Sequence, residues 1–142
     1  MNIFYISEDP VQAAQWMVDK HVVKMILESA QLLSTAHRLL DGEQIMGKSK
    51  TGRNAKRWKL HDSRETVVYQ ATHINHPSAV WCRASVENYN WLADHLHALL
   101  QEYTYRYGKV HKVQRDGLLN KLLHTPANIA SNFQFTEPTP AM

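Results

Sequence analysis

Residues 11–41 form the longest stretch of this chain that contains neither glycine nor proline. Apolar residues recur through it at the spacing of one helix face. They are Ala14, Met17, Val18, Val22, Met25, Ile26, Leu32, Leu33, Ala36 and Leu40. Ser7 or Asp9 is the expected N-cap ahead of Pro10, and Asp41-Gly42 is a typical helix end. The pattern predicts a single long helix from about residue 10 to residue 40.

A second stretch without glycine or proline lies between Pro77 and Gly108. Its apolar residues again follow helical spacing. They are Val86, Tyr89, Leu92, Leu96, Leu99 and Tyr103. We predict a second long helix that begins at Ser78 or Ser85 and ends near Tyr107, with Gly108 as its C-cap.

The segments around these helices are expected to be less regular. Three glycines and many charges predict a basic loop at 41–60, and residues 134–142 read as a flexible tail. The run at 66–74 fits a strand or a helix equally well. Pro77 disfavours a helical conformation for His76, so a break is expected there. A short third helix is predicted around 117–123.

Size and composition favour one domain spanning residues 1–142. The hydrophobic fraction of 44% and the charged fraction of 20% are ordinary for globular proteins. The predicted fold class is mostly all-α: a compact domain with two long helices, a short third helix and a basic connecting loop. No apolar run suits a membrane span, and the N-terminus lacks the pattern of a signal peptide. The single cysteine, Cys82, is expected in the core of a protein from a reducing compartment.

The positive charge is concentrated in the predicted loop. The formal net charge is only +3, but no acidic residue interrupts the basic cluster between positions 48 and 59. The cluster consists of Lys48, Lys50, Arg53, Lys56, Arg57 and Lys59. Such clusters neutralise phosphates and provide the sequence-independent part of nucleic-acid affinity. The alternative is a solvated basic loop without a ligand.

A group of ionisable residues borders the apolar face of the first predicted helix. At 100° per residue, His21 and Glu28 lie within roughly 20° of each other, two turns apart, and Lys24 lies between them. Partial desolvation beside a cation tunes a carboxylate for acid–base chemistry. The alternative is structural: a Lys24–Glu28 ion pair, with His21 hydrogen-bonded at the core boundary.

Two further clusters carry chemistry-bearing side chains. His73 and His76 could ligate a metal together with Cys82 or Glu28, which would suit a metal-dependent hydrolase, but the spacing matches no metal-site motif and no metal is expected. In an aromatic and basic region, Trp91 and Tyr103 are assigned to packing. The possible phosphate contacts there are Arg83, Arg106, Lys109 and Lys112. No phosphate-binding glycine loop, nucleophile elbow, Cys-x-x-Cys or dinucleotide fingerprint is present.

The step Asp19-Lys20-His21, followed by Glu28 seven residues after the histidine, resembles the bacteriophage pyrimidine-dimer DNA glycosylases of the endonuclease V type. In that family a long early helix carries an Asp-x-His step and a catalytic glutamate at this spacing. His76-Pro77 resembles the histidine that opens a later helix. Glu102 followed by Arg106-Tyr107-Gly108 resembles the end of that helix. The chain is similar to a divergent member of this family.

The resemblance implies glycosylase or glycosylase/lyase chemistry on damaged or modified pyrimidines in DNA, without a cofactor, metal or obligate protein partner. An N-terminal amine attacks the sugar in that family, which implicates Met1; an exposed Asn2, Lys20 or Lys24 are alternatives. Glu28 would stabilise the cationic sugar, and His21 would position it.

The implied DNA-binding residues are Lys24, Arg53, Lys56, Arg57, Lys59, His73, His76, Arg83, Arg106 and Lys109. If the chain is phage-encoded, the cytoplasm of a bacterial host is the expected location. A non-catalytic nucleic-acid-binding phage protein on the same scaffold is the alternative.

Overall fold

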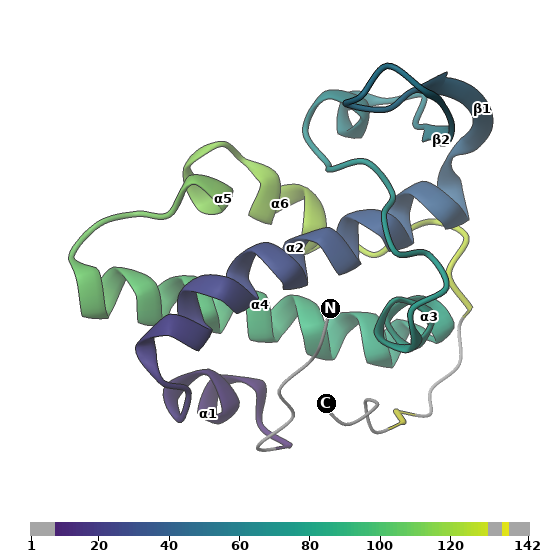
Figure 1. Cartoon of the computed structure of the whole chain (residues 1–142). Coiled ribbons are helices and arrows are strands. Elements are labelled where there is room, and N and C mark those ends of the chain that lie inside the picture. Colours follow the sequence, from purple (N-terminus) through teal and green to yellow (C-terminus); the bar gives the residue numbers. More distant parts are fainter. Residues whose placement is uncertain (1–7, 131–134, 137–142) are drawn as a thin grey trace.

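The computed structural model describes residues 8–130 and 135–136, and its main layer consists of helices (Figure 1). In chain order the elements are α1 (Pro10–Gln15), α2 (Asp19–Asp41), β1 (Glu43–Lys48), β2 (Asn54–Lys59), the 3₁₀ turn η1 (Ser63–Thr66), α3 (Pro77–Ala84), α4 (Val86–Tyr107), α5 (Lys112–Arg115) and α6 (Leu118–Leu122). The mostly helical class is therefore confirmed, with one antiparallel pair of strands that the prediction lacked.

The single helix predicted over 10–40 is wrong at its first third, because the chain breaks between α1 and α2. Asp9 caps α1 by accepting a hydrogen bond from the Val11 amide at 3.0 Å, as expected. The break is stabilised from α4: the Arg106 guanidinium donates to the carbonyls of Met17 at 2.8 Å and Gln15 at 3.1 Å. These carbonyls at the end of α1 thus find a partner outside the helix.

The second long helix also proves to be two helices. Ser85 is extended and caps α4, its hydroxyl accepting from the Asn88 amide at 3.1 Å. Both predicted starting points are therefore used, one by α3 and one by α4. His76 is extended ahead of Pro77, and Gly108 ends α4 in the left-handed conformation with φ of 69°, both as predicted.

The basic segment predicted as a loop is instead a β-hairpin. The strands pair antiparallel with Glu43 opposite Lys59 and Lys48 opposite Asn54. Gly52, with φ of 81°, lies in the connecting turn. The charged residues obscured the strands because lysine and arginine are uncommon in them, although both are tolerated where strands face solvent.

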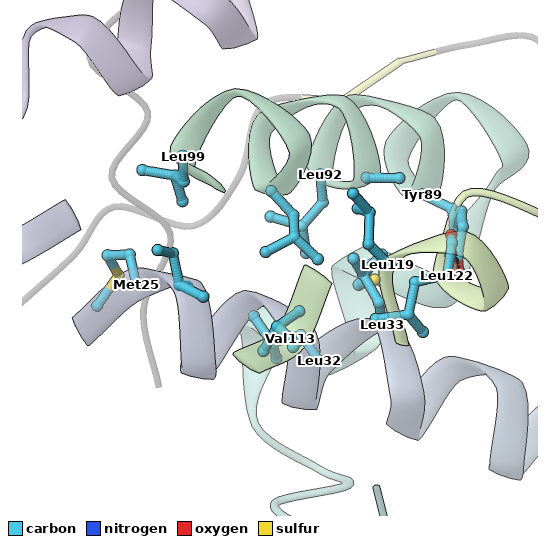
Figure 2. Close-up of a cluster of buried hydrophobic side chains, with 14 of the residues drawn as sticks. Met25, Leu32, Leu33, Tyr89, Leu92, Leu99, Val113, Leu119 and Leu122 are labelled. Atoms are coloured by element: carbon cyan, nitrogen blue, oxygen red, sulfur yellow. Dashed lines mark hydrogen bonds between the residues drawn. The ribbon is translucent and has the colours of Figure 1, made fainter. Parts of the chain in front are cut away.

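The core lies between α2 and α4, which run antiparallel, with α5 and α6 packed over one side of the layer (Figures 1 and 2). Buried side chains shown in Figure 2 include Met25, Leu32, Leu33, Tyr89, Leu92, Leu99, Val113, Leu119 and Leu122. Cys82 is fully buried, as predicted, and burial raises the pKa of its thiol. Of the expected tail, Phe135 packs edge-on against Trp81, and the Thr136 amide donates to Asn88 at 3.0 Å.

The segment at 66–74, which sequence patterns left open between strand and helix, is neither. It leaves η1 and continues without regular structure to the start of α3. We refer to residues 67–76 as the strap, because they run from η1 back across α2. Among the described helices, none is both long and apolar enough to cross a membrane.

Candidate functional site

The strap and the hairpin are held in place by one buried arginine near the end of α2. Arg38 is 1% exposed, and its guanidinium spans the hairpin, η1 and the strap. It donates to the carbonyls of Trp58 at 2.9 Å, Tyr69 at 3.0 Å and Val68 at 2.8 Å, and to the Glu65 carbonyl at 3.0 Å. It also forms an ion pair with the Glu65 carboxylate. A buried charge is tolerated here because every side of it is hydrogen-bonded.

Thr35 fastens the next part of the strap to α2. Its hydroxyl accepts from the Thr72 amide at 3.2 Å and donates to the Thr72 carbonyl at 3.4 Å. Thr35 is seven residues after Glu28, so the two side chains project from nearly the same face of α2, two turns apart. The strap therefore passes along the helix face that carries Glu28.

A cleft of about 820 Å³ opens between α2, the hairpin and the strap. Leu27 and Gln31 line it from α2. Lys48, Ser49, Lys50 and Arg57 line it from the hairpin, and Tyr69, Gln70, Ala71 and Thr72 from the strap. None of the described residues that line the cleft is acidic. The cleft thus offers three cations to an anionic ligand.

Glu28 is not among the residues that line this cleft, and it projects from α2 about 60° around the helix from Gln31, which does line it. Its side chain is half-buried, and its Oε2 is buried without a hydrogen-bond partner in the described part of the chain. Within residues 8–130 and 135–136, neither an ion pair nor a hydrogen bond joins Glu28 to the exposed Lys24, so the structural alternative of a Lys24–Glu28 pair is not realised. A buried carboxylate oxygen left unpaired is costly unless a ligand completes it.

His76, the last residue of the strap, lies near this carboxylate. His76 caps α3, its Nδ1 accepting from the Ser78 amide at 3.1 Å, which places the proton of the neutral ring on Nε2. Desolvation lowers the pKa of His76 and the nearby imidazole of His73 lowers it further, while the carboxylate of Glu28 acts in the opposite direction. The Glu28 carboxylate is thus close enough to His76 to affect its pKa, and the imidazole carries its proton on Nε2.

The backbone at His73 is unusual. Its φ is 48°, in the left-handed region that a residue with a side chain adopts at a cost on the order of 1 kcal/mol. The His76 amide donates a hydrogen bond to the His73 carbonyl at 3.0 Å. This bond closes a turn at the end of the strap, immediately before α3. Such conformations are common at functional sites, where the surrounding structure holds them.

Apart from Arg83 on α3, the other predicted site residues divide into three groups. His21 is half-buried on α2 two turns before Glu28, whereas Met1 lies outside the described residues. Arg53, Lys56 and Lys59 are exposed on the hairpin with the cleft cations. The third group lies apart, at the far end of α4 from the hairpin (Figure 1).

Arg106 and Lys109 make up this distant group. The Arg106 guanidinium is occupied by Glu102 at 3.0 Å and Asp19 at 2.9 Å besides the two carbonyls of the helix break. These four partners occupy the Arg106 guanidinium within the fold, so we leave it out of the proposed DNA-binding surface.

Arg83 lies on α3, half-buried, and its Nη1 is buried without a hydrogen-bond partner among the described residues.

Sequence patterns missed Arg38, Thr35 and Gln31. Arg38 lies among apolar positions of a helix, and an arginine on a buried face is itself a signal of a polar network. Its partners, however, are carbonyls 20 to 31 residues away, which no local pattern reveals.

A second buried network connects η1 to the core on the other side of α2. Arg64 donates to His37 Nδ1 at 2.9 Å and to Asp41 at 2.7 Å. His37 Nε2 meets the Tyr89 hydroxyl at 2.7 Å, and that hydroxyl donates to the Leu122 carbonyl at 2.6 Å. His37 is therefore neutral with its proton on Nε2. Burial, reinforced by the charge of Arg64, lowers the pKa of His37 to about 4.

No group of three histidine, cysteine, aspartate or glutamate side chains converges on a possible metal position in the part of the chain that the structure describes. Comparison of the chain with protein-family models, with curated proteins and with solved structures finds no match.

Proposed function

We propose that this protein is a DNA glycosylase or glycosylase/lyase that acts on a damaged or modified pyrimidine nucleotide. The observation that carries the proposal is Glu28 Oε2, which is buried and has no hydrogen-bond partner within the described residues. Glu28 is on the same turn of α2 as Leu27 and Gln31, which line the cleft that carries the cations. A carboxylate in that state lacks the counter-charge that it would meet in a cationic sugar.

The cleft and the carboxylate would divide the work. Lys48, Lys50 and Arg57 would hold phosphates of the strand through charge-assisted hydrogen bonds. Glu28 would face the sugar, where positive charge develops at C1′ as the bond to the base breaks and its electron pair leaves with the base. The Nε2–H of His76 would donate to an oxygen of the sugar or phosphate.

In the lyase version, a neutral amine attacks C1′ and forms an imine after the base departs. Loss of a C2′ proton then expels the 3′ phosphate, and water releases the amine. The amine would be that of Met1, as the family resemblance implies; an exposed Asn2, Lys20 and Lys24 are the alternatives. An α-amine has a reference pKa near 8, so a useful fraction is neutral at physiological pH.

Borohydride trapping on end-labelled DNA that carries a thymine dimer or an abasic site tests the imine. A covalent adduct formed only with borohydride is expected, and sequencing it identifies the amine. Glu28→Gln should lower single-turnover cleavage by about 100-fold or more while DNA binding is kept. Glu87→Gln, on α4, is the matched control and should cleave normally. Full activity in Glu28→Gln would contradict the proposed role of Glu28 in catalysis.

A non-catalytic nucleic-acid-binding role is the second candidate. It is favoured by the exposure of the hairpin cations, because a protein that only binds nucleic acid needs cations on its surface but no catalytic carboxylate. Here DNA binding would be strongly salt-dependent, no adduct would form, and Glu28→Gln would be indistinguishable from the wild type in every assay. Replacing Lys56, Arg57 and Lys59 should reduce the salt slope by up to about three units.

A further inference from the structure

The two faces of the β1–β2 hairpin differ in exposure and in side-chain type. Opposite residues of antiparallel strands share a face, so Ile45 lies with Arg57 and Met46 lies with Lys56. The Ile45 face combines the exposed Glu43, Ile45 and Lys59 with the half-buried Gly47, Ala55 and Arg57, and its Arg57 lines the cleft, as does Lys48 of the other face. The other face turns to solvent. Apart from the half-buried Trp58 at its base, it consists of exposed Gln44, Met46, Lys48, Asn54 and Lys56.

The solvent face carries the side chains that recognise base edges. Amides bind adenine in the major groove, lysine binds guanine O6 and N7, and an apolar side chain contacts the methyl group of thymine. Met46 is 67% exposed in the middle of this face, between lysines. Contact with phosphates alone would not require the exposed Met46.

The size of the hairpin selects the groove. Its two strands lie roughly 5 Å apart, and the major groove of B-form DNA, about 12 Å wide, admits a two-stranded ribbon. The minor groove, about 6 Å wide, does not. The major groove of A-form RNA is too narrow and deep for side chains to read. The hairpin also stands beyond the end of α2, clear of the helical layer (Figure 1).

We infer that the hairpin enters the major groove of B-form duplex DNA, with Gln44, Met46, Asn54 and Lys56 facing base edges. The inference rests on the proposed function for its ligand, duplex DNA, and is independent of the chemistry at Glu28. The Lys48 ammonium donates to the Asn54 side chain at 2.6 Å, so the two form one polar unit at the far end of the face.

The experiment measures binding of the full-length protein to three short duplexes of one sequence. The first is unmodified DNA; in the second, thymines carry a neutral C5 octadiynyl chain that fills the major groove; in the third, inosine replaces guanine and alters only the minor groove. Affinity should fall about ten-fold or more for the second and stay within about two-fold for the third. A duplex of RNA should bind more weakly than DNA.

Two matched variants of β1 test which face of the hairpin contacts the DNA. Met46→Ala should weaken binding to unmodified DNA by about ten-fold and reduce the penalty of the C5 chain, because the face no longer reaches the thymine methyl groups. Ile45→Ala, one residue away on the opposite face, should bind within about two-fold of wild type. Circular dichroism and urea unfolding of both variants establish that each is folded.

Three outcomes would overturn the inference: a penalty only for inosine, equal binding of RNA and DNA duplexes, or equal effects of Ile45→Ala and Met46→Ala. These outcomes leave the proposed function intact, since cleavage by the wild type and its loss in Glu28→Gln are measured separately. Absence of any binding to duplex DNA would end both proposals. Groove-dependent binding with full cleavage by Glu28→Gln would end the proposed mechanism alone.

Discussion

Arg38 and Glu28 are charged residues of the same helix, ten positions apart, and both face the strap or the segments next to it. Arg38 is 1% exposed, and its guanidinium is surrounded by four backbone carbonyls and a carboxylate. Glu28 is half-buried, and its Oε2 is buried without a hydrogen-bond partner among the described residues. Within the described residues, the fold supplies hydrogen-bond partners for the Arg38 guanidinium but none for Glu28 Oε2.

This difference helps to distinguish a charged residue that stabilises the fold from one that takes part in function. A buried charge with every hydrogen bond made stabilises one arrangement of the chain, here the hairpin and strap on α2. A buried oxygen with no bond made contributes nothing favourable to folding and requires another explanation. The comparison therefore predicts opposite consequences when the two charges are removed, with stability affected at Arg38 and activity at Glu28.

The largest expected effect on stability comes from Arg38→Leu. It leaves the carbonyls of Trp58, Tyr69 and Val68 and the carboxylate of Glu65 without their partner, and it should reduce the free energy of unfolding by about 3–5 kcal/mol. Urea unfolding followed by circular dichroism measures it. Arg38→Lys should recover only part of the loss, because an ammonium cannot reach all these acceptors. A loss below about 1 kcal/mol would show that the network is dispensable.

A smaller effect per residue is expected from lowering the pH, which charges buried histidines. Burial lowers the pKa of both His37 and His95 to about 4, whereas the unfolded value is 6.5. The unfolded state therefore binds more protons below pH 6.5, so stability is fully present above that pH and is lost as the pH falls toward 4. Each histidine should cost about 2 kcal/mol at pH 5 relative to pH 7.

Urea unfolding at pH 7 and pH 5 measures this difference, and His95→Phe provides the control. His95 stacks on Trp91 at 5.0 Å, so phenylalanine keeps the ring contact but cannot be protonated. The variant loses the bond to the Pro10 carbonyl and should be less stable at both pH values, but its pH-dependent difference should be about half that of the wild type. An unchanged difference would exclude His95 as a source of the pH dependence.

The local features of the fold could be read from sequence because each depends on neighbouring residues. Asp9, Ser85 and Gly108 cap helices through groups two to four positions away, and Pro77 fixes the conformation of His76. The break after α1 could not be read, because the Arg106 that stabilises it is 89 residues from Met17. The hairpin was missed for a different reason: its strands bury little, so they show no apolar alternation.

The candidate site was predictable to the same degree. The spacing of His21 and Glu28 placed them on one helix face, and His76 before a proline marked the start of a helix. Spacing could not show that Thr35 binds Thr72 and brings the strap to that face. It also could not show that Glu28 remains unpaired with Lys24, since an i, i+4 spacing permits the pair without requiring it.

The smallest expected effect on stability is that of Glu28→Gln, and it completes the comparison with Arg38. The substitution keeps the shape of the side chain and removes a charge whose buried Oε2 makes no hydrogen bond with the described residues. The free energy of unfolding should therefore change by less than about 0.5 kcal/mol, or increase. The same urea titration measures it, with Glu87→Gln as the reference. A loss above about 1 kcal/mol would mean that Glu28 holds a structural bond, and its open oxygen would then no longer distinguish it from Arg38.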